Sequence, residues 1–108
     1  MASSREYLDF ILEQLSGAEG VTFRAMMGEF IIYIRGRIAG GVYDDRFLVK
    51  DTAAARRLMP DAPLEEPYEG AKPMLLVQDI DDRALMTELL EAMYPELPEP
   101  KQKRRQKQ

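Results

Sequence analysis

The sequence predicts an α+β fold, in which an antiparallel sheet of about five strands carries helices from both ends of the chain. Between Met26 and Asp51, three short runs of β-branched and aromatic residues are separated by Arg35-Gly36 and Asp44-Asp45, which is typical of successive β-hairpins. A block of neighbouring strands with helices at its ends favours α+β over a doubly wound sheet. The predicted order is helix, four strands, short helix, strand and helix.

In the first part of the chain, the spacing of apolar residues changes from helical to alternating. The change falls at Gly17 and Gly20, where the first helix is expected to end. Apolar residues recur at helical spacing from about Ser4 to Ser16. Ser3 or Ser4 can cap this helix, and Ser3 with Glu6 has capping-box spacing. Residues 21–25 then alternate as in a half-buried strand. The strands of the hairpin block follow over 30–34, 37–43 and 47–50.

The second part begins with a short helix over residues 53–59, ended by Pro60. Residues 60–73 contain four prolines and are expected to form an irregular connection, from which Leu64 and Tyr68 contact the core. Residues 74–77 form a wholly apolar run, as in a central strand buried on both faces. A final helix is expected from an Asp81 cap to about Tyr94.

The core is predicted from the apolar phase of each element. Its expected members are Leu8, Ile11, Leu12, Leu15, Phe23, Ile32, Val42, Leu75, Val77, Leu85, Leu89 and Leu90. Gly40-Gly41, within a strand, predicts a bulge or a close backbone approach, since a phosphate-binding loop needs glycines in a strand-to-helix turn.

The chain of 108 residues contains neither cysteine nor histidine. These absences exclude thiol and imidazole nucleophilic catalysis and most zinc or non-haem iron chemistry. The acidic clusters Asp44-Asp45 and Asp79-Asp81-Asp82 could hold a cation or transfer protons, but hairpin turns and helix caps explain them better. We therefore expect no enzyme activity, no cofactor and no metal.

Charge is unevenly distributed along the chain. Residues 1–100 contain ten Lys and Arg against nineteen Asp and Glu, a net charge of −9, whereas 101–108 contain five cations and no acid. The cations are Lys101, Lys103, Arg104, Arg105 and Lys107. We expect a folded domain over 1–94 and a disordered basic tail over 95–108. The acidic domain repels polyphosphates, so nucleic-acid binding is expected to be weak and to occur through the tail alone.

The expected location is the cytoplasm. No apolar run approaches the ~20 residues that span a bilayer, and MASSREY lacks the features of a secretory signal. We expect a monomer or weak homodimer whose partner is a protein.

The hairpin block resembles the N-terminal domain of TfoX/Sxy proteins. The resemblance rests on Met27-Gly28-Glu29-Phe30, the hairpin at Gly36, and the run from Val42 to Lys50, with Pro73-Met74 before the fifth strand. It covers about residues 5–95. It implies an α+β fold with helices on one face of an antiparallel sheet, and no catalytic residues. Full-length members regulate natural competence and carry a second, C-terminal helical domain, so this chain resembles a stand-alone member.

Three residues of the domain are candidates for interaction. Met27 could contribute to an adaptable apolar surface, or one methionine of Met26-Met27 could fill the core. Lys50 could bind an anion or pair with Asp44, Asp45 or Asp51. Tyr68 could join Tyr33 and Tyr43 in an aromatic patch, or all three could pack in the core or at its rim. The sequence thus predicts a non-catalytic regulatory or protein-interaction domain. The alternative is a nucleic-acid-associated protein that uses its basic tail.

Overall fold

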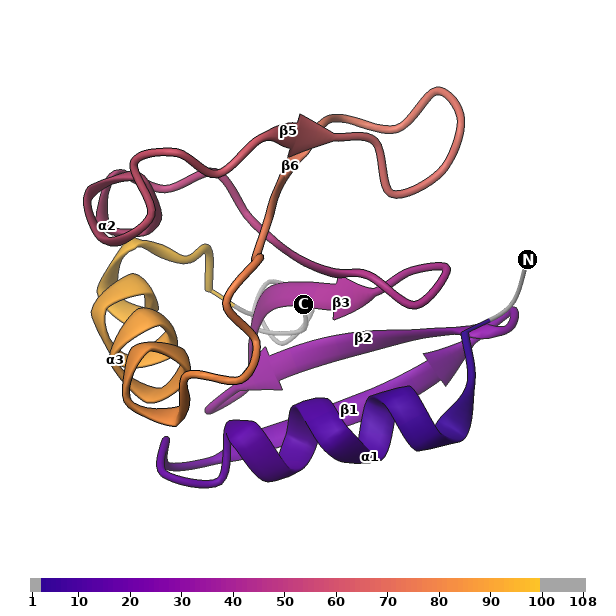
Figure 1. Ribbon diagram of the computed structural model, residues 1–108, viewed down its shortest axis with the longest axis horizontal. Helices are drawn as coiled ribbons and strands as arrows, with labels where there is room; N and C mark the ends of the chain where they lie inside the picture. Colours follow the sequence, from indigo (N-terminus) through magenta and orange to yellow (C-terminus); the bar gives the residue numbers. More distant parts are fainter. Residues whose placement is uncertain (1–2, 100–108) are drawn as a thin grey trace, which may run out of the picture.

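The computed structural model describes residues 3–99, which fold into one antiparallel sheet and three α-helices (Figure 1). The helices are α1 (Arg5–Gln14), α2 (Ala53–Leu58) and α3 (Arg83–Met93), and the 3-10 helix η1 (Tyr94–Glu96) follows α3 directly. The strands are β1 (Val21–Met26), β2 (Glu29–Ile34), β3 (Arg37–Val42), β4 (Phe47–Val49), β5 (Leu64–Glu65) and β6 (Met74–Leu76). The predicted α+β class is confirmed.

The strands lie in the order β1-β2-β3-β4-β6-β5, and every neighbouring pair is antiparallel. Strand β6 pairs with both β4 and β5, which gives it the interior place expected for residues 74–77. Strand β5 was not predicted, because two residues within a proline-rich connection carry no periodic signal. The outer strands are therefore β1 and β5.

Two-residue turns join the first four strands. Their residues all have positive φ: Met27 52° and Gly28 87°, Arg35 46° and Gly36 86°, Asp44 54° and Asp45 55°. Two successive positive φ values are those of a type I′ turn, whose twist matches that of paired strands. The turns at Arg35-Gly36 and Asp44-Asp45 confirm the predicted hairpins, and Met27-Gly28 joins β1 to them.

The glycines of β3 allow a close approach of three strands. The register of β2 and β3 shifts between Ile32 and Tyr33, as at a bulge. A Cβ on Gly40 would overlap the Leu48 carbonyl oxygen, and one on Gly41 would lie 2.7 Å from the Phe30 carbonyl oxygen. The predicted close approach at Gly40-Gly41 is confirmed, and the bulge lies one residue earlier, at Ala39, which the register leaves without an opposite residue.

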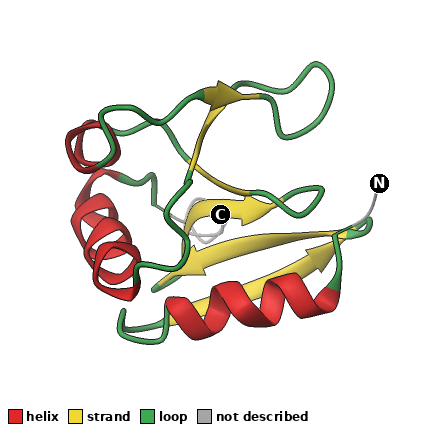
Figure 2. Cartoon of the chain, viewed as in Figure 1, coloured by secondary structure: helices red, strands yellow, loops and turns green. Residues whose placement is uncertain are grey.

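All three helices contribute to a single core on one face of the sheet. Figure 2 shows the helices and the sheet that enclose it. The fully buried large side chains are Leu8, Ile11, Leu15, Ile32, Ile34, Phe47, Leu48, Leu75, Met86, Leu89, Leu90 and Met93. Of the predicted core, Leu12 and Phe23 pack against this cluster while partly buried, and Leu85 is partly buried outside it. The prediction missed Phe47 and Met93, among others.

Of the two caps expected for the first helix, Ser4 is confirmed and Ser3 is not, and the cap expected at Asp81 is wrong by one residue. The Ser4 hydroxyl accepts from the Tyr7 amide, and the Asp82 carboxylate accepts from the Leu85 amide. The Ser3 hydroxyl instead donates to the Glu29 carboxylate at 2.6 Å and accepts from the Asp45 amide at 3.1 Å. Ser3 thus fastens the start of the chain to two hairpin turns.

The structured part of the chain runs past the boundary expected at residue 94. Leu97 is only 4% exposed and belongs to the core. The Arg37 guanidinium donates to the Tyr94 and Leu97 carbonyls, and the Glu96 carboxylate accepts from the Ala54 amide at 2.9 Å. The expectations for Leu64 and Tyr68 are also wrong, since 50% and 65% of these residues are exposed.

Candidate functional site

The second face of the sheet, here called the open face, lies away from the helices and the core. The register places its side chains in cross-strand rows, one of them Thr22–Tyr33–Ile38. Its apolar members are Met26, Ile31, Tyr33, Ile38, Tyr43, Leu48, Met74 and Leu76, and none belongs to the cluster under the helices, although Leu48 is itself fully buried. Ile38 is 40% exposed and Met26 48%. The open face is therefore a partly exposed apolar surface.

A pair of tyrosines covers part of this face. Because Gly41 has no side chain, the Tyr43 ring lies directly over it, 2.7 Å from where a Cβ would be. The rings of Tyr43 and Tyr68 are in contact: their centroids are 6.3 Å apart, and their planes are inclined at 57° to each other. Burial, and then the nearby Tyr68, Glu29 and Tyr33, raise the pKa of Tyr43. The Tyr43 hydroxyl thus remains protonated and able to donate at neutral pH.

Arg46 fixes the loop that carries Tyr68. Its guanidinium donates to the Glu65 carboxylate at 2.8 Å and to the carbonyls of Glu66 and Pro67 at 3.3 and 3.2 Å. It also donates to the Tyr43 carbonyl at 3.1 Å. One side chain therefore holds the loop against the β3–β4 turn, which places Tyr68 beside Tyr43.

A groove of about 470 Å³, here called the Tyr68 groove, adjoins the tyrosine pair. It is bounded by residues 50–52 after β4, by the loop before β6, and by residues 96–98. Lys50 and Lys72 both line it, and neither forms an ion pair with another residue in the range 3–99. Asp51, bound to Arg56, and Glu96, bound to the Ala54 amide, also line the groove, so its charges are mixed. Its aromatic and proline-rich wall suits a segment with apolar side chains.

The predicted interaction residues are only partly brought together. Lys50 and Tyr68 share the Tyr68 groove. Met27 lies in the β1–β2 turn, 97% exposed, and does not fill the core. Lys101, Lys103, Arg104, Arg105 and Lys107 lie outside the described residues. Tyr33, Tyr43 and Tyr68 do come close to one another, because Tyr43 lies near Tyr33 and Arg46 holds the loop that carries Tyr68 beside Tyr43.

The proposed pairing of Lys50 with a neighbouring aspartate is not observed in the described structure. Asp51 binds Arg56 through two hydrogen bonds of 2.6 and 2.8 Å, which lower the pKa of this carboxyl. The backbone amide of Asp44 donates to Glu29, and the carboxylate of Asp45 accepts from the Ser4 amide at 2.9 Å. The aspartates of this turn therefore tie hairpins to α1.

Within residues 3–99, no group of three or more potential metal-ligating side chains comes together. Asp82 serves as the α3 cap, and the Asp79 carbonyl accepts from its amide. Nor does any helix in this range have the length and apolarity needed to cross a bilayer.

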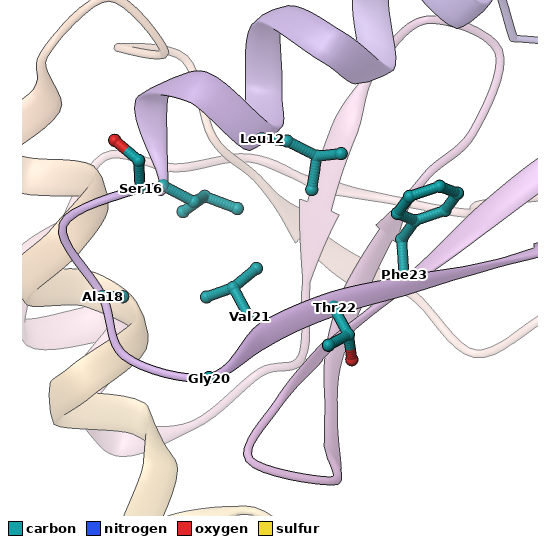
Figure 3. Close-up of a pocket in the computed structure, with 8 residues that line it drawn as sticks. Leu12, Ser16, Ala18, Gly20, Val21, Thr22 and Phe23 are labelled. Carbon is teal, nitrogen blue, oxygen red and sulfur yellow. The ribbon is translucent and has the colours of Figure 1, made fainter.

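A second groove, of about 550 Å³, lies between the C-terminal end of α1 and the start of β1. In Figure 3, Leu12 extends from the helix toward Val21 and Phe23, whereas Thr22 points to the other side of the strand. We call this the α1–β1 groove. It could not be inferred from the sequence, although the partial burial of Leu12, Val21 and Phe23 now explains it.

The fold and the open face define an α+β domain with helices on one side of an antiparallel sheet. The chain is 30% identical over 102 residues to the "Uncharacterized 12.7 kDa protein in trpE 5'region" of Spirochaeta aurantia. The matched region covers 94% of this chain and 89% of the relative. The chain belongs to the same family as this 12.7 kDa protein. No family model and no solved structure matches the chain.

Proposed function

We propose that this chain is a non-catalytic protein-interaction domain whose binding surface is the open face with the Tyr68 groove. The observation that carries the proposal is the exposed aromatic and aliphatic surface on this side of the sheet. Tyr68 is 65% exposed, Met26 48% and Ile38 40%, although each could have been polar without disturbing the core. Exposed apolar side chains that gather on one face are typical of interaction sites on proteins.

The composition of the surface fits a protein partner. Tyrosine and methionine are enriched at protein interfaces, and tyrosine provides a large contact area together with a hydrogen-bonding hydroxyl. The net charge of −9 over residues 1–100 works against binding of nucleic acid by the domain. A partner segment with apolar side chains would match the tyrosines, and the mixed charges of Lys50, Asp51, Lys72 and Glu96 suit polar groups at its margin.

A regulatory role in the manner of TfoX/Sxy proteins is part of this proposal. It is supported by the residues from Met27 to Lys50 that resemble the family's N-terminal domain, and the α+β fold is consistent with that resemblance. The cytoplasmic location expected from the sequence belongs to the same proposal.

The experiment is capture of partners from the native cell lysate, with and without nuclease. We compare the original chain with the double variant Ile38→Ser/Tyr68→Ser. The control is Phe10→Ser on α1, since Phe10 and Ile38 are 39% and 40% exposed. We expect a protein partner that survives nuclease, that Phe10→Ser retains and that the double variant loses. Loss of the partner on nuclease treatment, or equal capture by all three chains, would contradict the proposal.

A further inference from the structure

The outer edge of β1 presents a row of backbone groups without partners among residues 3–99. The Gly20 carbonyl accepts from the Arg35 amide at 2.8 Å, and Met26 lies opposite Glu29 at the turn. Because hydrogen-bonded and non-hydrogen-bonded pairs alternate along antiparallel strands, the amides and carbonyls of Val21, Phe23 and Ala25 point away from β2. The strand is six residues long, and it contains no proline and one charged residue. Such an edge is a template for a further strand.

The α1–β1 groove lies beside this edge, on the face of the sheet that α1 covers. Its walls are apolar and include Leu12, Leu15 and Val21. Near the start of β1 it is lined by Ala18 and Gly20, whose small size leaves room there. A strand added to β1 would place alternate side chains under the flank of α1, next to Leu12. The edge and the groove together therefore suit an extended segment with apolar side chains.

Met27 has the properties of a side chain that could enter this groove. It is apolar, 97% exposed, and lies at the opposite end of β1, in the type I′ turn. A positive φ of 52° is unfavourable for methionine, and asparagine or glycine would be more usual there. The local conformation of the turn therefore does not explain a methionine at this position.

We propose that two copies of this chain associate by antiparallel pairing of their β1 strands about a two-fold axis at Phe23. In this register Phe23 pairs with Phe23 of the second copy, and Val21 pairs with Ala25 of the second copy, all through the outward-pointing backbone groups. Met26 of the second copy then lies opposite Gly20, and its Met27 lies opposite Glu19, beside the α1–β1 groove. Because the axis is two-fold, each copy supplies one Met27 and one groove, as a closed isologous dimer requires.

Charge disfavours the neighbouring register that has its axis one residue later. A two-fold axis at Arg24 would bring the two Arg24 side chains together, and like charges directly opposite one another on a sheet are destabilising. The axis at Phe23 puts Arg24 opposite Thr22 of the second copy. The tail is not a suitable occupant, because residues 101–108 contain only Lys, Arg and Gln and cannot fill an apolar groove. The acidic domains repel each other at long range, so added salt should strengthen the dimer.

The test is sedimentation equilibrium of the full 108-residue chain at about 0.1 mM, a concentration suited to weak association. We expect a monomer–dimer equilibrium. Met27→Asn should raise the dissociation constant about tenfold, a change that corresponds to 1.4 kcal/mol. This variant keeps the hairpin, since Asn-Gly is a preferred type I′ turn. Ala25→Pro removes one outward amide and should weaken the dimer further. Asp44→Asn, in the turn of another hairpin, is the matched control and should leave the equilibrium unchanged.

Cross-linking supplies an independent measurement, because the chain has no cysteine of its own. Phe23→Cys should form a dimer on mild oxidation, since paired residues in adjacent strands lie within disulfide reach. Ile38→Cys, on the open face, should not. A chain that is monomeric in sedimentation and does not cross-link through Phe23→Cys would overturn the proposal. That result would hold even if a different protein were found to bind the groove. A dimer that Met27→Asn and Ala25→Pro leave unchanged, or that cross-links equally through Ile38→Cys, would overturn it too.

Discussion

Gly40 occupies a position where the neighbouring strand leaves no room for a side chain. Its Cβ would overlap the Leu48 carbonyl oxygen and lie 2.7 Å from the Val49 Cα, both of them backbone atoms that cannot rotate away. We expect Gly40→Ala to lower the free energy of unfolding by about 1–3 kcal/mol, as overpacking does. Urea unfolding measures this. At Gly17 the nearest atom is the Thr87 hydroxyl, a side chain that can move. Gly17→Ala should therefore be milder, and equal effects would contradict the argument.

Glu91 joins three parts of the fold through its carboxylate. It accepts from Arg35 Nη2 at 2.9 Å and from the Glu19 amide at 3.0 Å. These bonds, that from Arg35 first, lower the pKa of Glu91. A lowered pKa in the folded state stabilises the fold above the ordinary carboxyl pKa, and this contribution is lost as the pH falls through the lowered value.

We therefore expect Glu91→Gln to lower the thermal midpoint at pH 7 and to make progressively less difference as the solution becomes more acidic. The effect is modest, below about 1 kcal/mol, because the side chain is 39% exposed. Thermal unfolding over a pH series measures it. Glu88 lies on the same helix without a hydrogen bond or ion pair to residues 3–99, so Glu88→Gln is the control. A midpoint difference that does not change with pH would show that the charge of Glu91 is not responsible.

At the scale of elements, the segment after α3 is part of the fold rather than of the tail. Leu97 is 4% exposed, and its carbonyl accepts from Arg37 at 3.2 Å. We expect Leu97→Ala to cost about 2–5 kcal/mol, the range for a buried leucine. Leu64→Ala is the matched control, because Leu64 is 50% exposed. Chemical unfolding of both variants measures the difference, and a Leu97→Ala protein as stable as the Leu64→Ala protein would place the boundary at residue 94 again.

The elements that could be predicted from the sequence are those with local signals. Strands β1 to β4 were predicted from short runs of β-branched and aromatic residues between turn residues. Helices α1 and α3 were predicted from apolar residues at helical spacing. Strand β5 and Leu97 have no such signal, because contacts with segments distant in the sequence place them. The same is true of the site. Tyr33, Tyr43 and Tyr68 could be named as candidates, but their common face depends on the bulge and on how Arg46 holds the loop.

At the scale of the whole molecule, the residues that form the core and the residues that carry the basic charge lie in different parts of the sequence. The buried core is assembled from residues 8–97, whereas residues 101–108 contribute five cations and no apolar side chain. We expect deletion of 101–108 to change the free energy of unfolding by well under 1 kcal/mol, since exposed charges interact weakly. Thermal unfolding of chains 1–108 and 1–100, at low and high salt, tests this.

A DNA titration should accompany that comparison. Five phosphate contacts with duplex DNA would give a salt slope of about −4.5, so any binding by the tail should be weak and should vanish near physiological salt. A large loss of stability on deletion, or DNA binding that persists at high salt, would contradict this interpretation of the tail.

The three two-residue turns have a consequence for how the chain reaches its native state. The three pairings among strands β1 to β4 join strands that follow one another in the sequence, so each of these pairings closes a very short loop. Short loops lose little entropy on closure, and chains rich in local contacts fold faster. Strand β6 must instead close a loop of about 24 residues to reach β4. The meander of β1–β4 should therefore form the folding nucleus, and docking of β6 and α3 should follow it.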